Sequence, residues 1–160
     1  MILRPTPSFV FSHPAHAVAF GFGAGLAPTA PGTFGTLLGW VIGLGLVALH
    51  PGAVLLAALV FFALGVWACD VTGRHLGVAD HGGMVWDEVA AFLLVLAIVP
   101  RELPWQLAAF AAFRFFDIAK PPPIRHFERR YHGGFGVMFD DVLAAGYSLL
   151  LLAAVKRLFF

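Results

Sequence analysis

The sequence predicts an all-α integral membrane protein: one membrane-embedded domain over residues 1–160, with four to five short hydrophobic helices and polar loops on one face. The first observation is composition, because 60% of the residues are apolar and 12% are charged, against about 45–50% and about 25% in soluble domains. The second is charge placement, since no Asp, Glu, Lys or Arg occurs from Pro5 to Cys69. A soluble bundle of this size has too small a core to hide such helices.

The predicted helices are bounded by Gly, Pro or polar residues. The segment Phe20–Gly35 is too rich in Gly and Pro for a helix interior, Leu76–Met84 is expected to be a loop, and Lys120–Phe139 a polar segment. Helices are expected over Thr36–Leu49, Ala53–Cys69, Trp86–Val99, Trp105–Ala119 and Val142 to about Phe160. They are shorter than the roughly 20 residues of a straight crossing, so some are expected to be tilted or partly submerged.

Pairing these helices as hairpins places three polar segments on one side of the membrane. Charged residues of that side are Asp70, Arg74, Asp80, Asp87, Glu88, Lys120, Arg125, Glu128, Arg129, Arg130, Asp140 and Asp141. The opposite turns carry only Arg101 and Glu102. The positive-inside bias makes the charged side cytoplasmic. Lys156 and Arg157 argue weakly against this orientation, unless they snorkel or the last helix does not cross.

Two pairs of adjacent acids stand at predicted helix starts, Asp87-Glu88 and Asp140-Asp141. Adjacent carboxylates repel, and a hard cation such as Mg²⁺ would relieve that repulsion. The alternative is ordinary helix capping, which Asp and Glu also perform. Because two pairs share one membrane face, we predict that all four residues hold Mg²⁺.

A basic group accompanies these acids. Arg114 and Asp117 are three residues apart on one helix face, and charges next to an apolar run usually face the bundle interior. Arg114, Lys120 and Arg125 are predicted to bind a phosphate, with Asp117 joining the metal set. The alternative is a local ion pair between Arg114 and Asp117.

Three further residues are candidates for the site. Thr33 lies in a Gly-rich helix start whose free backbone N–H groups can bind an anion. Asp80 and His81 could transfer protons, although a lone His is more often structural. Several other classes are excluded: the net charge of +1 gives no basic excess for nucleic acid, and no P-loop, HExxH or G-x-S-x-G motif is present.

Four stretches of the chain resemble the phosphatidylglycerophosphatase A family in order and spacing. They are GFGAGLAPTAPGTFGTL (Gly21–Leu37), DHGGMVWDE (Asp80–Glu88), FRFFDIAKPPPI (Phe113–Ile124) and HGGFGVMFDDVLAAG (His132–Gly146). One departure is Ala91, where the family usually has Gly.

The resemblance implies a Mg²⁺-dependent lipid phosphatase that converts phosphatidylglycerophosphate to phosphatidylglycerol and inorganic phosphate at the cytoplasmic face of a bacterial inner membrane. It implies a multi-pass protein whose partners are this substrate and membrane lipids, and it leaves homo-oligomerisation open. Asp80, His81 and Asp117 are the expected catalytic residues. The main alternative is a small transporter or channel subunit whose acids form an ion path.

Overall fold

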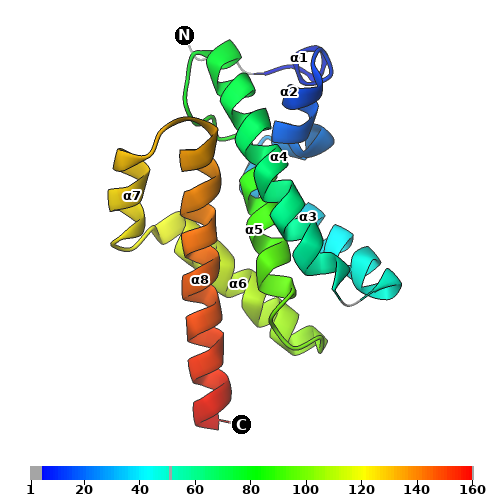
Figure 1. Ribbon diagram of the computed structural model, residues 1–160, viewed down its shortest axis with the longest axis vertical. Coiled ribbons are helices and arrows are strands. Elements are labelled where there is room, and N and C mark those ends of the chain that lie inside the picture. Colours follow the sequence, from blue (N-terminus) through cyan, green and yellow to red (C-terminus); the bar gives the residue numbers. More distant parts are fainter. Residues whose placement is uncertain (1–4, 51, 160) are drawn as a thin grey trace.

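The computed structural model describes residues 5–50 and 52–159, and every regular element found in that part of the chain is helical (Figure 1). The elements in chain order are α1 (Pro7–Val10), α2 (Pro14–Ala19), the 3₁₀ helix η1 (Gly21–Leu26), α3 (Pro31–Leu49), α4 (Ala53–Leu76), α5 (Trp86–Leu96), α6 (Leu103–Ala119), α7 (Ile124–Arg130) and α8 (Gly133–Phe159). The prediction of an all-α bundle is confirmed.

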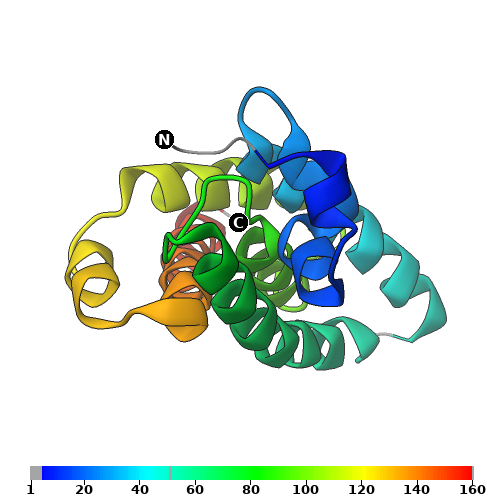
Figure 2. The same cartoon turned by 90° about the horizontal axis from the view of Figure 1, so that it is seen from above.

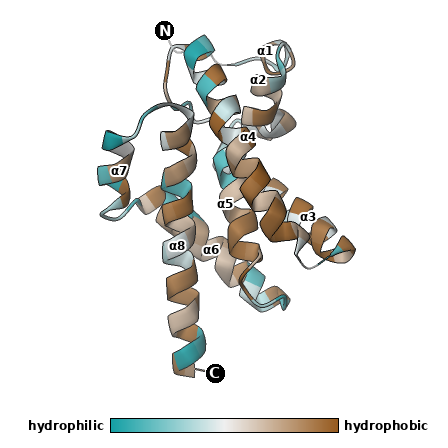
Figure 3. Ribbon diagram, in the orientation of Figure 1, coloured by the Kyte–Doolittle hydropathy of each residue, from teal (hydrophilic) through white to brown (hydrophobic). Residues whose placement is uncertain are grey.

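Three of these helices, α3, α4 and α8, are long and apolar enough to cross a membrane. Figure 3 shows long hydrophobic stretches in these helices, with hydrophilic residues at the upper end of α4 and at the C-terminal end of α8. The helices α5 and α6 have 11 and 17 residues, so at 1.5 Å per residue α5 extends only about 16 Å. Three spans and two shorter helices therefore make up the membrane bundle that the composition predicts.

Several helix boundaries differ from those predicted. The helix α3 starts at Pro31 rather than Thr36, because proline at the first helical position loses no hydrogen bond. The helix α4 continues past Cys69 to Leu76, and α5 ends at Leu96, before the predicted Val99.

The polar segment Lys120–Phe139 contains more helix than expected. It includes α7 and the first two turns of α8, which begins at Gly133. A Cβ on Gly134 would collide with the carbonyl of Val66 on α4. The glycines that made a helix improbable in this segment are thus what lets α8 pack closely against α4.

The helix α5 forms the centre of the bundle. Nine of its residues are buried, and α3, α4, α6 and α8 all contact it. Seen from above, α3 and α7 lie at opposite edges of the bundle with α5 between them (Figure 2). A chain segment surrounded in this way can bring side chains from distant parts of the sequence to one place.

A row of small residues on α3 packs against α5. A Cβ on Gly35 would lie 2.8 Å from the carbonyl oxygen of Val85, and one on Gly39 would lie 2.9 Å from that of Val89. Such small residues allow helix backbones to approach closely in a membrane. This contact brings the first turn of α3 next to the first turn of α5.

Candidate active site

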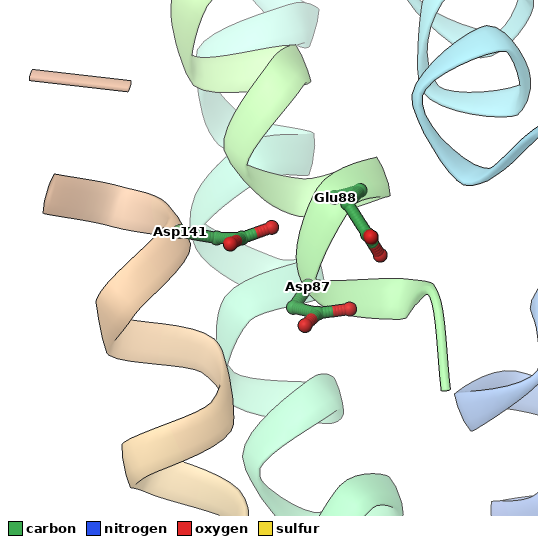
Figure 4. A group of neighbouring side chains, drawn as sticks. All are labelled: Asp87, Glu88 and Asp141. Carbon is green, nitrogen blue, oxygen red and sulfur yellow. The ribbon is translucent and has the colours of Figure 1, made fainter. Parts of the chain in front are cut away.

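Three buried carboxylates converge where α5 begins. Asp87 and Glu88 lie in the first turn of α5, and Asp141 points toward them from α8 (Figure 4). Each contributes one carboxylate oxygen to a group whose members lie within 4.8 Å of one another. We call these three residues the carboxylate cluster. The predicted meeting of the two acidic segments is therefore seen in the structure.

One oxygen of each carboxylate has no hydrogen-bond partner among the described residues: Asp87 Oδ1, Glu88 Oε2 and Asp141 Oδ2. A buried oxygen without a partner costs about 1–3 kcal/mol, and more if it is charged. Because the acids that carry these oxygens also place one carboxylate oxygen each within 4.8 Å of the others, the donor set fits a hard divalent cation that accepts oxygen ligands, such as Mg²⁺.

The electrostatics of Asp87 and Glu88 favour the binding of positive charge. Asp87 and Glu88 lie outside the three candidate spans. Burial, followed by the neighbouring Glu88 and Asp141, raises the pKa of Asp87 well above its usual value. Burial also raises the pKa of Glu88 to about 7, although Asp87 and Arg114 oppose this shift. Asp87 and Glu88 therefore bind protons more readily than ordinary carboxylates do.

Arg114 on α6 connects the cluster to a fourth acid. Its Nη1 donates to Glu88 Oε1 at 3.4 Å and also pairs with Asp117, while its Nε is buried without a partner among the described residues. Because Nη1 of Arg114 contacts both Glu88 and Asp117, the two carboxylates lie on either side of one guanidinium. The pair of Arg114 and Asp117 is thus part of the site and more than a local ion pair on α6.

Asp140 and Lys120 form a separate pair beside the cluster. Lys120 Nζ lies 2.6 Å from Asp140 Oδ2. The group of three carboxylates does not include Asp140. The structure thus brings together three of the four predicted metal ligands and places the fourth against one of the predicted phosphate-binding cations.

The first turn of α3 also reaches the site. A Cβ on Gly32 would lie 2.9 Å from Arg114 Nη1 and would collide with Glu88 Oε1. Thr33, the predicted phosphate contact, is the next residue and is partly buried. Glycine is therefore required at position 32 for Glu88 and Arg114 to occupy their observed positions.

The remaining predicted site residues lie outside the group of three carboxylates found in the described part of the chain. Asp80 and His81 belong to the loop between α4 and α5, where the backbone N–H of Gly83 donates to His81 Nδ1 at 3.0 Å. Arg125 is exposed at the start of α7 and donates to the carbonyl of Ala119 at 3.1 Å. Their predicted roles stay predictions.

Sequence reasoning missed a second cluster of titratable groups, formed by His13, His16 and His75 and here called the histidine cluster. His16 Nε2 lies 2.8 Å from His75 Nδ1, and the ring of His13 is 5.3 Å from that of His16. The spacing of His13 and His16 was the available signal, because residues three apart share a helix face. Nothing local to the sequence indicates that His75 joins them.

Comparison with known proteins identifies the family of the chain. The family model described as phosphatidylglycerophosphatase A matches residues 17–156. Phosphatidylglycerophosphatase A of Haemophilus influenzae is 45% identical over 156 residues, which cover 96% of this chain and 95% of that protein. The Escherichia coli protein of the same name is 38% identical over 142 residues, or 88% of this chain and 83% of that protein.

A third relative carries a different name. A Bacteroides thetaiotaomicron protein, provisionally named a phosphatidylinositol-3-phosphatase, is 42% identical over 147 residues, or 87% of this chain and 91% of that protein. No solved structure matches the chain. The family model and the two relatives of that name show that this chain belongs to the phosphatidylglycerophosphatase A family and is a phosphoric monoester hydrolase.

Proposed function

We propose that the protein hydrolyses phosphatidylglycerophosphate to phosphatidylglycerol and inorganic phosphate, with Mg²⁺ held by Asp87, Glu88 and Asp141. The observation that carries this proposal is the carboxylate cluster itself, with three unpartnered buried oxygens next to Arg114. The names of two relatives support the choice of lipid. A bound Mg²⁺ would supply electrostatic stabilisation of the charge on the transferring phosphoryl group.

Arg114 is the cation best placed to hold the phosphate in this proposal. Its Nε is a free donor while Nη1 is anchored by Glu88 and Asp117, so the guanidinium is oriented before substrate arrives. Lys120 lies on the flank of the site with Asp140. Lys120 and Arg125 would attract the dianionic headgroup, and the N–H groups near Thr33 would complete its binding.

Asp117 is the proposed general base. It pairs with Arg114, which also contacts Glu88 of the cluster. In the proposed reaction a water oxygen bonds to phosphorus and a proton of that water passes to Asp117. The bond from phosphorus to the glycerol oxygen breaks, and that oxygen takes up the proton from Asp117, which gives the alcohol of phosphatidylglycerol and restores the carboxylate. Asp80 and His81 stay candidates for proton transfer from the neighbouring loop.

We also propose that the site faces the cytoplasm of a bacterial inner membrane. The segment between α6 and α8 carries Lys120, just after α6, and Arg125 and Arg130 in α7. The positive-inside bias favours these cations on the cytoplasmic side. The transporter alternative is less well supported, because an ion path would distribute acids through the membrane rather than collect them around one arginine.

The experiment is release of inorganic phosphate from phosphatidylglycerophosphate in detergent micelles by the purified protein, with Mg²⁺ or with a chelator. Asp87→Asn and Asp141→Asn should each lower kcat/KM at least about 100-fold, more than the loss expected for a residue that only supports a ligand. Asp70→Asn is the matched control, because Asp70 is an exposed acid paired with Arg74 at 2.8 Å. It should retain nearly full activity.

Two results would contradict the proposal. One is a wild-type protein that is folded but releases no phosphate with Mg²⁺ present. The other is activity of Asp87→Asn and Asp141→Asn equal to that of Asp70→Asn. Phosphatidylinositol 3-phosphate serves as the second substrate, and faster hydrolysis of it would move the headgroup assignment to the inositol lipid.

A further inference from the structure

An apolar groove of about 300 Å³ lies between α4, α5 and α8. All of its lining residues are apolar. The small ones are Ala58 and Ala90, and the aromatic ones are Phe62, Phe135 and Phe139. Phe62 of α4 and Phe135 of α8 meet edge to face with ring centroids 6.1 Å apart. The groove is therefore bounded by side chains of three different helices.

The groove opens on the side of the protein that lipid would cover. Two of its three helices, α4 and α8, are candidate membrane spans. Leu59 lies on its rim and is 61% exposed. Water is not expected to fill an apolar space at this position, because it would find no hydrogen-bond partners there.

The groove begins next to the carboxylate cluster. Its lining residue Ala90 follows Asp87 by three positions on α5, less than one helical turn, and Val142 directly follows Asp141 on α8. Leu94 continues the lining one turn further along α5. A molecule with its phosphate at the cluster and a hydrocarbon chain attached could therefore place that chain along α5.

We infer that this groove binds one acyl chain of the lipid substrate while its phosphate is at the carboxylate cluster. This inference rests on the proposed function and adds a binding subsite to it. The volume is about twice that of a cavity of about 150 Å³ that binds benzene, so the groove holds the part of the chain nearest the headgroup. Binding there fixes the position of the phosphate relative to the carboxylates and Arg114.

The first test compares two substitutions on one helix. Leu59→Trp places a large ring at the rim of the groove, whereas Leu56→Trp makes the same change at a residue that is 64% exposed and does not line it. Both are measured with long-chain phosphatidylglycerophosphate and with a dihexanoyl analogue. Leu59→Trp should lower kcat/KM for the long-chain lipid about tenfold, the equivalent of about two methylene groups left unburied. Its activity on the dihexanoyl analogue, and both activities of Leu56→Trp, should stay within about twofold of wild type.

Equal losses on both substrates, or no loss on either, would overturn the inference. Hydrolysis of either lipid by the wild-type protein tests the proposed function, and the ratio of the two substrates in the variant tests the groove. The two failures are therefore distinguishable.

A second measurement does not depend on how the variants fold. A phosphatidylglycerophosphate analogue with a photoreactive diazirine in one acyl chain should label the segments around Leu59 and Phe139 of the wild-type protein. Excess unlabelled substrate should abolish this labelling, and phosphatidylcholine should leave it unchanged. Labelling that phosphatidylcholine removes equally well would identify an ordinary bilayer lipid in the groove and overturn the inference.

Discussion

The protein gathers titratable side chains at two places, and the two differ in how their polar atoms are used. In the histidine cluster, His16 Nδ1 donates to the carbonyl of Phe9 at 3.1 Å and Nε2 bonds His75 at 2.8 Å. The ring of His16 also stacks on Phe9 at 4.2 Å. In the carboxylate cluster, each of the three acids has a buried oxygen without a partner in the described part of the chain.

This difference separates a structural cluster from a functional one. Hydrogen bonds at both nitrogens of His16 join α2 to the last turn of α4 and to the carbonyl of Phe9 in α1, so they stabilise the packing of the first helices. Unpartnered carboxylates lower stability instead, and a fold that keeps three of them side by side needs a ligand to compensate. We therefore interpret the histidine cluster as a packing feature and the carboxylate cluster as the site of chemistry.

The largest effect that separates the two clusters is expected from metal binding. At a free Mg²⁺ concentration of 100 times Kd, the wild-type free energy of unfolding should rise by about 2.7 kcal/mol. The same increase should appear in His16→Phe and disappear in Asp141→Asn. Thermal unfolding in detergent, followed by tryptophan fluorescence, measures it. An increase that survives in Asp141→Asn would show that Mg²⁺ binds elsewhere.

A smaller effect is expected from the glycine that admits Glu88 and Arg114. Gly32→Ala should destabilise the protein by about 1–3 kcal/mol, the usual cost of overpacking, and should lower kcat because both side chains must move. Gly45 is the matched control on the same helix, since a Cβ there meets no atom within 4 Å. Gly45→Ala should be neutral or stabilising by up to about 1 kcal/mol. Equal stability and activity of both variants would show that the first turn of α3 does not contribute to the site.

The smallest effect is a pH dependence at the histidine cluster. Burial, with the nearby His75 and His13, lowers the pKa of His16 below the ordinary value of 6.5, although the hydrogen bond to Phe9 opposes the shift. The unfolded chain then binds the proton more readily than the folded protein between the lowered pKa and 6.5. Stability should therefore be greatest above pH 6.5 and fall as the pH drops through that interval.

His16→Phe is the variant that tests this pH dependence. It keeps a ring against Phe9 but cannot titrate, so the difference in unfolding free energy between pH 7.5 and pH 5 should shrink. Chemical unfolding in detergent at both pH values provides the measurement. An unchanged pH dependence in His16→Phe would assign it to other groups.

The boundaries of the helices show where local sequence rules stop being sufficient. The hydrophobic runs predict α3, α4, α5, α6 and α8, but Gly and Pro led to late predicted starts for α3 and α8. In both helices the glycines of the first turns lie against a neighbouring segment: Gly35 against Val85, and Gly134 against Val66. Packing against another helix outweighs the low helix propensity of glycine, and the partner segment is far away in the sequence.

The amino-acid sequence by itself determined that the protein is helical and membrane-embedded, and that its acids and bases gather near the ends of a few helices. The reason is that hydropathy and charge belong to each residue separately, so the character of a segment is the sum over its residues and can be read from the sequence. Only the tertiary structure decided which acids meet. Asp140 and Asp141 point about 100° apart around α8, and the packing of α8 against α4, with Gly65 leaving room for Met138, turns Asp141 to the cluster and Asp140 to Lys120.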